Sequence, residues 1–213
     1  IKQKIMLKKS RVILLALAAL IMTSCGDVVS NLGGMKTDSP EVFDKAKELA
    51  KANFDPAQWK VVSVDWSEGI GDDELTGKVT SIRFYIIDKD GKAWQQSFIA
   101  SLGWKASDLD DTSFAKGDKY SDPKDFPALE LDKIDAAKYT KIIEDAKALI
   151  PKGYKFKSVD AFSMDTYNKT PIKLTLNVVE EGKETVSNAG KTSIVFYELS
   201  YSVDDNFKVT LND

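Results

Sequence analysis

Segments in which apolar and polar residues alternate recur along the chain, and they predict strands of an antiparallel sheet. In residues 79–88, Ile82, Phe84 and Ile86 share one face, and Asp90-Gly91 follows as a tight turn, where glycine tolerates a positive φ. Each such segment presents one apolar and one polar face, because side chains alternate between the two sides of a strand. We expect strands at residues 59–66, 79–88, 92–100, 172–178, 193–203 and 207–211.

Two other segments carry apolar residues at helical spacing, each between a start and a stop signal. Ser39-Pro40 begins the first, because serine caps a helix N-terminus and proline suits its first turn, and Asp55-Pro56 ends it. Asp135 caps the second, and Pro151 with Gly153 ends it. The apolar stripes predict that each helix packs against a sheet.

The order of these elements occurs twice in the chain, with short matches between the two copies. Ala50-Lys51-Ala52 matches Ala146-Lys147-Ala148, and Ser63-Val64-Asp65 matches Ser158-Val159-Asp160. A shared order of elements together with local matches indicates an internal duplication. The alternative is two unrelated units of helix and sheet that use ordinary turns.

The repeated order predicts the fold class and the domain organisation. We expect an α+β fold of two tandem units, each a helix packed on an antiparallel β-meander. The units would occupy residues 40–107 and 135–213. Residues 108–134 would form a connector, with a short strand at residues 129–131.

The N-terminal segment has the order of a secretory signal. A basic start at residues 8–11 precedes an apolar run at residues 12–22, and small Thr23 and Ser24 lead to Cys25, the only cysteine. This segment resembles the bacterial lipoprotein signal, which implies that residues 1–25 form the signal and that Cys25 is acylated and holds the protein to a lipid bilayer. Residues 26–39 would be a flexible tether. The alternatives are a buried structural cysteine and cleavage to a free protein.

The charge and the missing residue types exclude several classes of function. Residues 1–24 hold five basic and no acidic residues, so residues 25–213 carry 25 basic against 33 acidic side chains, a net charge of −8. Such a chain lacks the basic surface of a nucleic-acid-binding protein. The sequence has no histidine, which excludes Ser-His-Asp and Cys-His catalysis and a histidine-ligated zinc. We expect no cofactor.

Acidic loops offer the candidate metal ligands. Asp72-Asp73-Glu74 lies between two predicted strands, and Asp88-Lys89-Asp90-Gly91 matches part of a calcium loop but lacks its later ligands and closing glutamate. Both are more typical of solvated turns, as are Asp108, Asp110 and Asp111. We therefore expect no metal site, and no pair of carboxylates stands out as catalytic residues.

The order of helix and then meander, doubled behind a lipoprotein signal, resembles the PepSY-like and β-lactamase-inhibitor-protein-like lipoproteins of Bacteroidetes. The resemblance covers residues 40–213 and rests on element order. It implies a lipoprotein of the cell envelope, with the outer membrane favoured, that is a non-catalytic protein-binding, peptide-binding or inhibitory module. The alternative function is an envelope hydrolase that uses carboxylates, or a glycan-binding protein.

The predicted strand at residues 193–203 is apolar on both sides, which suggests a ligand surface. Its two faces consist of Val195, Tyr197, Leu199 and Tyr201, and of Ile194 and Phe196. One helix shields only a stripe of a sheet, so we expect Tyr197 and Tyr201 to point away from the helix of residues 136–150 and to contact a protein or peptide ligand. The alternative is that both rings pack in the core.

Overall fold

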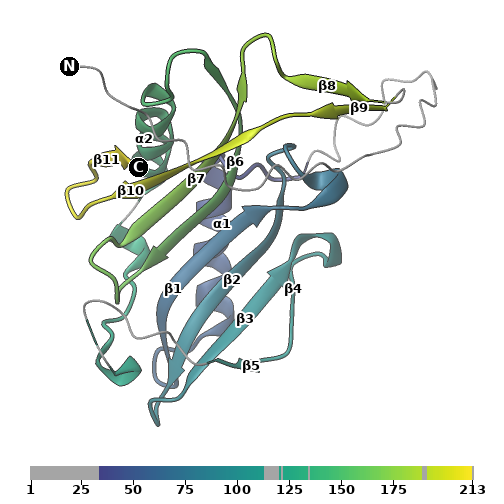
Figure 1. The fold of residues 1–213 in the computed structure, drawn as a ribbon. Coiled ribbons are helices and arrows are strands. Elements are labelled where there is room, and N and C mark those ends of the chain that lie inside the picture. The colour runs from purple at the N-terminus through teal and green to yellow at the C-terminus, as the bar shows by residue number, and fades with distance from the viewer. Residues whose placement is uncertain (1–33, 113–119, 121, 134, 189–190, 213) are drawn as a thin grey trace.

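The computed structural model of the protein describes residues 34–112, 120, 122–133, 135–188 and 191–212 (Figure 1). Its α-helices are α1 (Pro40–Asn53) and α2 (Ala136–Ala148). Its strands are β1 (Trp59–Glu68), β2 (Val79–Asp88), β3 (Ala93–Ile99), β4 (Lys105–Ala106), β5 (Asp110–Asp111), β6 (Tyr154–Asp165), β7 (Ile172–Glu180), β8 (Thr185–Asn188), β9 (Lys191–Ile194), β10 (Tyr197–Val203) and β11 (Val209–Leu211). Single 3₁₀ turns occur at Gly71–Asp73, Ala100–Leu102, Pro123–Asp125 and Leu131–Lys133.

Both helices begin where their capping residues predict. The Ser39 side chain accepts a hydrogen bond from the Glu41 N–H at 3.3 Å, and Pro40 occupies the first helical position. The Asp135 side chain accepts one from the Lys138 N–H at 2.7 Å. The apolar stripes that face the sheet are Val42, Phe43, Ala46, Leu49 and Ala50 in α1, and Tyr139, Ile142, Ile143 and Ala146 in α2.

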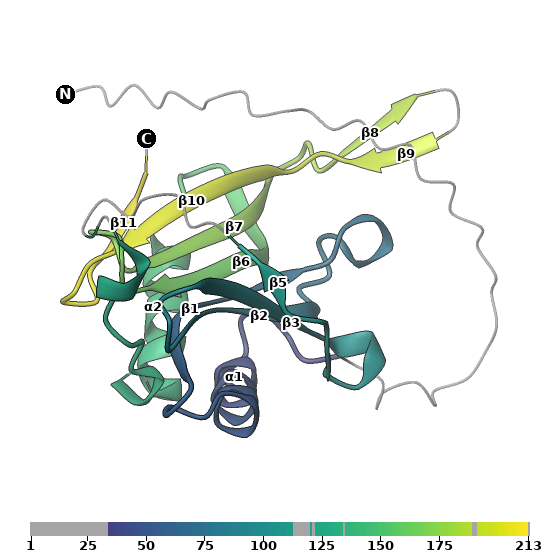
Figure 2. The same ribbon diagram turned by 90° about the horizontal axis from the view of Figure 1, so that it is seen from below.

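The prediction of two separate helix-on-meander units is wrong. The strands form one nine-stranded antiparallel sheet in the order β11-β10-β7-β6-β1-β2-β3-β4, with β5 beside β3. Both helices lie on the same side of this sheet (Figure 2), and one continuous hydrophobic core includes residues of both halves. The protein is therefore a single, mostly antiparallel sheet covered by two helices on one face.

The pairing of β1 with β6 explains this difference. Each is the first strand of its meander, so in separate units each would leave a row of unpaired backbone groups at an edge. Antiparallel pairing, with Asp65 opposite Ser163 and Trp66 opposite Phe162, removes both edges. The alternating pattern predicts which face a residue occupies, but it does not predict which strand lies alongside.

Four aromatic rings close the core where the two halves meet. Trp66 of β1 stacks on Phe162 of β6 with ring centroids 4.6 Å apart. Tyr139 of α2 contacts both rings edge-on, at 5.7 and 5.1 Å, and Phe43 of α1 stacks on Tyr139 at 5.9 Å. Each ring comes from a different element, so this cluster joins both helices to both central strands.

The part of the connector around Phe126 lies over the side of the sheet away from the helices, whereas Leu129 and Leu131 pack against the main core. Phe126 is 1% exposed and packs with Val62 and Ile87 in a second, smaller cluster, and its ring stacks on Tyr167 at 4.8 Å. The strand expected at residues 129–131 is absent from this described part of the connector. The Leu129 N–H instead donates one hydrogen bond, of 2.7 Å, to the Val61 carbonyl before the 3₁₀ turn Leu131–Lys133.

The single long strand expected at residues 193–203 is two strands. β9 pairs with β8 in a separate two-stranded hairpin that extends away from the main sheet (Figure 1). β10 begins at Tyr197 and pairs with β7 and β11 in the main sheet. Val195 and Phe196 connect the two strands, so Ile194 and Tyr201 belong to different sheets.

Candidate functional site

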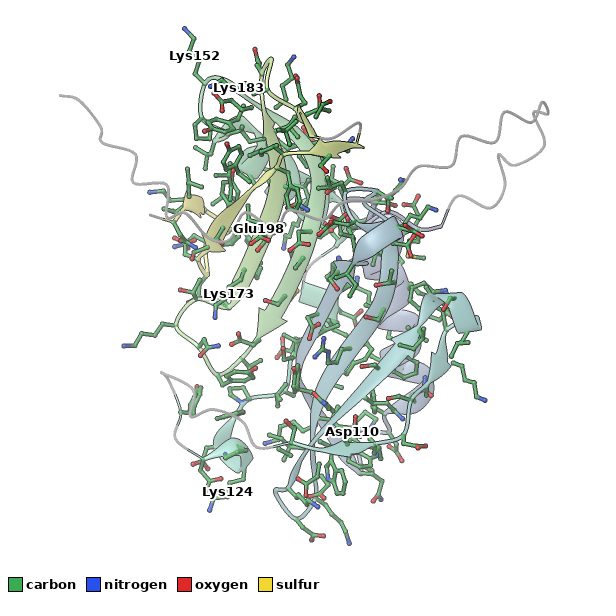
Figure 3. The ribbon with its side chains drawn as sticks, turned by 45° about the vertical axis from the view of Figure 1, so that its right-hand side comes forward. Asp110, Lys124, Lys152, Lys173, Lys183 and Glu198 are labelled. Carbon is green, nitrogen blue, oxygen red and sulfur yellow. The ribbon has the colours of Figure 1, made fainter. Side chains whose placement is uncertain are left out.

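The side of the main sheet away from the helices, which we call the open face, is polar. Strand alternation and the pairing register place its side chains there. They include Ser63, Asp65, Ser67, Ser81, Arg83, Tyr85, Ser97, Ser163, Lys173, Thr175, Asn177, Glu198, Ser200 and Ser202. Figure 3 marks this part of the sheet by Lys173 on β7 and Glu198 on β10. The open face therefore presents hydroxyls and separated charges, and not the ligand surface expected from Tyr197 and Tyr201.

The structure places the two predicted ligand-binding tyrosines on the helix side. Tyr201 is 0% exposed and belongs to the main core, where it pairs across the strands with Leu174. Tyr197 is half-buried against the same core, with its ring edge-on to Tyr154 at 5.5 Å. The expectation that both point away from the helix is thus wrong. It arose because β9 and β10 were read as one strand with two apolar faces, whereas Glu198, Ser200 and Ser202 form the second face of β10.

An unusual ion pair lies near the middle of the open face. The Nε of Arg83 on β2 is 3.5 Å from Oδ1 of Asp65 on β1, and these side chains are 39% and 25% exposed. Burial raises the pKa of Asp65 to about 6, and the nearby positive charge of Arg83 opposes this shift without cancelling it. Sequence reasoning missed this pair. The available signal was that Arg83 is the only arginine after Arg11 and alternates with apolar Ile82 and Phe84.

Charged and hydroxyl side chains form one row across the sheet at the level of this pair. Neighbouring members are register partners on adjacent strands, so they lie ~4.8 Å apart in the backbone. The row consists of Ser97, Arg83, Asp65, Ser163, Lys173 and Ser202. Two positive groups are thus separated by one negative group along a line that crosses six strands.

A second carboxylate with a raised pKa lies further along β6. Asp160 occupies an irregularity in the pairing of β6 with β7, between Val159 and Ala161. Burial raises its pKa to about 6, and the negative charges of Glu198, Glu68 and Glu74 add to the shift. This end of the open face is consequently a region of negative potential.

Glu68 fixes the loop that follows β1. It is 4% exposed, and one carboxylate oxygen accepts hydrogen bonds from the Leu75 N–H, the Ser158 hydroxyl and the Asn177 side-chain amide, at 3.1, 2.9 and 2.6 Å. Its other oxygen accepts one from the Gly77 N–H at 2.6 Å. Protein donors thus hydrogen-bond to both oxygens of the Glu68 carboxylate. Glu68 therefore holds the loop of residues 69–78 to β6 and β7.

Two of the acidic residues considered as calcium ligands, Asp88 and Asp111, have other partners. Asp88 accepts hydrogen bonds from the backbone N–H groups of Asp90 and Lys92 and from the Trp94 indole, each at 2.9 Å, which stabilises the turn between β2 and β3. The Trp94 hydrogen bond is the main reason that the pKa of Asp88 is lowered. Asp111 lies in β5 and pairs with Lys92 at 2.9 Å. Among the described residues, no group of three or more acidic, histidine or cysteine side chains is placed to hold a metal ion.

The grooves of the molecule lie away from the two perturbed carboxylates. A groove of about 640 Å³ runs between α1 and the connector, lined by Ala50, Phe54, Val61 and residues 129–132 among others. Another, of about 400 Å³, lies between residues 127–130 and the loops that follow β6 and β10. Neither Asp65 nor Asp160 lines either of these two grooves.

Comparisons with models of protein families, with curated proteins and with solved structures find no match for this chain. The predicted signal, Cys25 and most of the predicted tether lie outside the described residues. Within the described part, neither helix has the length and apolar character needed to cross a bilayer.

Proposed function

We propose that this protein is a lipid-anchored lipoprotein of the cell envelope, with the outer membrane favoured, that binds a protein or peptide partner without catalysis. The observation that carries the proposal is the open face, because two helices cover one side of the sheet and leave the central strands of the other side polar and accessible. The connector covers one end of that side, around Phe126. The rest is a broad, rigid surface on regular strands.

The size of the open face suits a protein partner. Five neighbouring strands, ~4.8 Å apart and roughly 30 Å long, span an area on the order of 700 Å². A protein–protein interface of standard size buries ~800 Å² on each partner. A peptide laid along two or three strands would use about half of that surface.

The charge pattern indicates the chemistry of the partner. Asp160 and Glu198 make one end of the face negative, with Glu74 on the adjacent loop, and residues 25–213 carry a net charge of −8. A partner that presents basic side chains to this end would associate faster and with the correct register. We therefore propose a partner with a basic patch, surrounded by polar groups that contact the serine and threonine hydroxyls.

The attachment of the N-terminal segment supports the anchoring part of the proposal. The Thr37 N–H and hydroxyl donate to the Gly77 carbonyl at 2.7 and 3.2 Å, and the hydroxyl lies 2.6 Å from the Val159 carbonyl. The Tyr139 hydroxyl of α2 donates to the Thr37 carbonyl. Thr37 belongs to the predicted tether, so the C-terminal end of that segment is fastened to both halves and is not flexible there. Residues 26–33 reach at most ~28 Å, which would keep the body near an acylated Cys25.

Site-specific photo-crosslinking tests the binding proposal. Benzoylphenylalanine would replace Thr175 on the open face or, as a matched control, Thr140, which is exposed on α2. We expect Thr175 to give a covalent adduct with one envelope polypeptide and Thr140 to give none. Glu198→Gln should lower the yield several-fold, because the partner is basic. Equal adducts from both positions, or none from Thr175, would contradict the proposal.

Labelling with a radioactive fatty acid tests the anchoring proposal separately. The full chain should incorporate label, and Cys25→Ala should abolish incorporation, because the thioether to the lipid forms at that sulfur. Label that persists in Cys25→Ala would show that the chain is acylated elsewhere or is not a lipoprotein of this kind.

One observation favours the alternative of a glycan hydrolase. Asp65 and Asp160 both have a pKa of about 6 and lie on the same side of the sheet. Ser163, the partner of Asp65, is three residues from Asp160, which separates the two carboxylates by about 10 Å along the strands. Glycosidase carboxylates lie roughly 5–9.5 Å apart around an enclosed sugar. Turnover of a cell-wall glycan that is lost in both Asp65→Asn and Asp160→Asn would favour the hydrolase.

A further inference from the structure

Arg83 differs from the other cations of the open face in its side chain and lies on an interior strand of the sheet. It is the only arginine after Arg11, whereas the other cations on the open face are lysines. The planar guanidinium presents five N–H donors in a fixed fork that matches the two oxygens of a carboxylate. β2 places it in the interior of the sheet, between β1 and β3, where the backbone is rigid. Such a position favours recognition more than solubility.

Arg83 makes only long polar contacts with the residues that the structure describes. Within the described part of the chain, Nε lies 3.5 Å from Asp65 Oδ1 and Nη1 lies 3.5 Å from the Tyr85 hydroxyl. The guanidinium carbon is also 6.0 Å from the centroid of the Tyr85 ring. Both polar distances exceed the ~2.7–2.9 Å of a charge-assisted hydrogen bond. The buried Nε has no hydrogen-bond partner within the described residues. The guanidinium is therefore held in place beside Asp65 without being saturated by it.

We propose that Arg83 binds one carboxylate of the partner through a two-pronged contact, and that Asp65 competes with this carboxylate for the guanidinium. This inference rests on the proposed use of the open face and names the group that the partner must present there. A carboxylate fits better than a phosphate, because a dianion would meet stronger repulsion from Asp65 and from the negative end of the face. The partner would thus present an acidic side chain or C-terminus opposite Arg83, and basic groups opposite Asp160 and Glu198.

The competition gives the subsite a pH dependence. Arg83 on β2 is the register partner of Asp65 and the charged group nearest to it. Tyr167, which follows the end of β6, interacts with Asp65 electrostatically, and Tyr85 and Asp165 interact with Tyr167 in turn. Tyr120 of the connector packs against the same small cluster. Burial raises the pKa of Tyr167 to about 12, so this phenol stays neutral. When Asp65 is protonated, it no longer competes as an anion for Arg83, so the affinity of Arg83 for the partner's carboxylate increases. Carboxylate binding should therefore strengthen as the pH falls through 6.

Nuclear magnetic resonance of the arginine side chain tests the subsite with small probes. The full chain in detergent micelles has two arginines, and loss of a signal in Arg83→Lys identifies the Nε–H resonance of Arg83. The probe is N-acetylglycine, a monocarboxylate that mimics a peptide C-terminus. Its uncharged methylamide is the matched control, and inorganic phosphate is the competing anion.

We expect N-acetylglycine to shift the Arg83 resonance saturably, with half-saturation at about five- to tenfold lower concentration near pH 5 than near pH 7. The methylamide should cause no saturable shift. Asp65→Asn should bind near pH 7 as the unmodified protein binds near pH 5. Backbone amide signals that match the unmodified protein would show that this variant is folded.

Several results would overturn the inference. They are the absence of a saturable shift near pH 5, a similar shift with the methylamide, tighter binding of phosphate than of the carboxylate, and an unchanged pH dependence in Asp65→Asn. This assay needs no macromolecular partner. A crosslink from Thr175 together with no shift would refute only the subsite, whereas a shift without any crosslink would refute the proposed function.

Discussion

The two faces of β1 and β6 differ in what lies against them, although consecutive residues form them. Trp66 is 1% exposed and stacks on Phe162 beneath both helices. Its chain neighbour Asp65 lies on the open face, with its side chain 25% exposed beside Arg83. Phe162 and Ser163 differ in the same way. One backbone therefore carries a packed core on one side and separated polar groups on the other.

This difference separates the residues that stabilise the protein from those proposed to bind. Burial of large apolar side chains on the helix face supplies most of the free energy of folding. Hydroxyls and a half-exposed ion pair on the open face contribute little, because water already satisfies them. Substitutions on the helix face should therefore act on stability, and those on the open face on binding and its pH dependence.

The largest effect is expected for Trp66→Ala. It removes the ring that contacts Phe43, Tyr139 and Phe162, and it should lower the free energy of unfolding by ~3–5 kcal/mol. Urea denaturation followed by circular dichroism measures this. Thr175→Ala on the open face is the control and should change stability by less than ~0.5 kcal/mol. Similar losses from both variants would remove the distinction between the faces.

A smaller loss is expected for Glu68→Ala, which tests the link between the loop and the sheet. Four donors would lose their acceptor, including the Ser158 hydroxyl and the Asn177 amide. The free energy of unfolding should fall by ~2–4 kcal/mol. Hydrogen exchange at the Leu75 and Gly77 amides should accelerate most. Exposed Asp72→Ala in the same loop is the control, and an equal effect there would show that Glu68 does not hold the loop.

The smallest effect is expected for Asp65→Asn, and its size depends on pH. The pKa of Asp65 is about 6 in the folded protein against 3.8 in its ordinary state, so the folded state binds more protons between these values. Stability contributed by this group consequently falls as the pH rises from about 4 to about 6. Removing the charge should stabilise the protein by ~1 kcal/mol near pH 7 and have little effect near pH 4. Thermal unfolding at both pH values measures this, and destabilisation near pH 7 would show that the Arg83 pair outweighs burial.

The sequence predicts both helices and the turn after β2, because their signals come from neighbouring residues. Ser39 and Asp135 cap their helices through contacts within three residues, and Asp90-Gly91 forms its turn through hydrogen bonds to Asp88. The break at Val195–Phe196 was not predicted, because it reflects pairing of β9 with β8 and of β10 with β7. Tyr201 was therefore expected on a ligand surface although it lies in the core.

The sequence alone predicts the candidate site only in part. Alternation alone places Asp65 and Arg83 opposite their apolar neighbours, but not beside each other. Register between β1 and β2 brings the two charges within 3.5 Å, and the connector that returns to Phe126 closes the end of the face. Sequence by itself determined the two helices, their caps and the polarity of the faces of strands such as β2, since these depend on contacts a few residues apart. Only the tertiary structure decided that β1 pairs with β6, because that pairing follows from satisfying backbone edges and burying aromatic rings contributed by segments 96 residues apart, as Trp66 and Phe162 are.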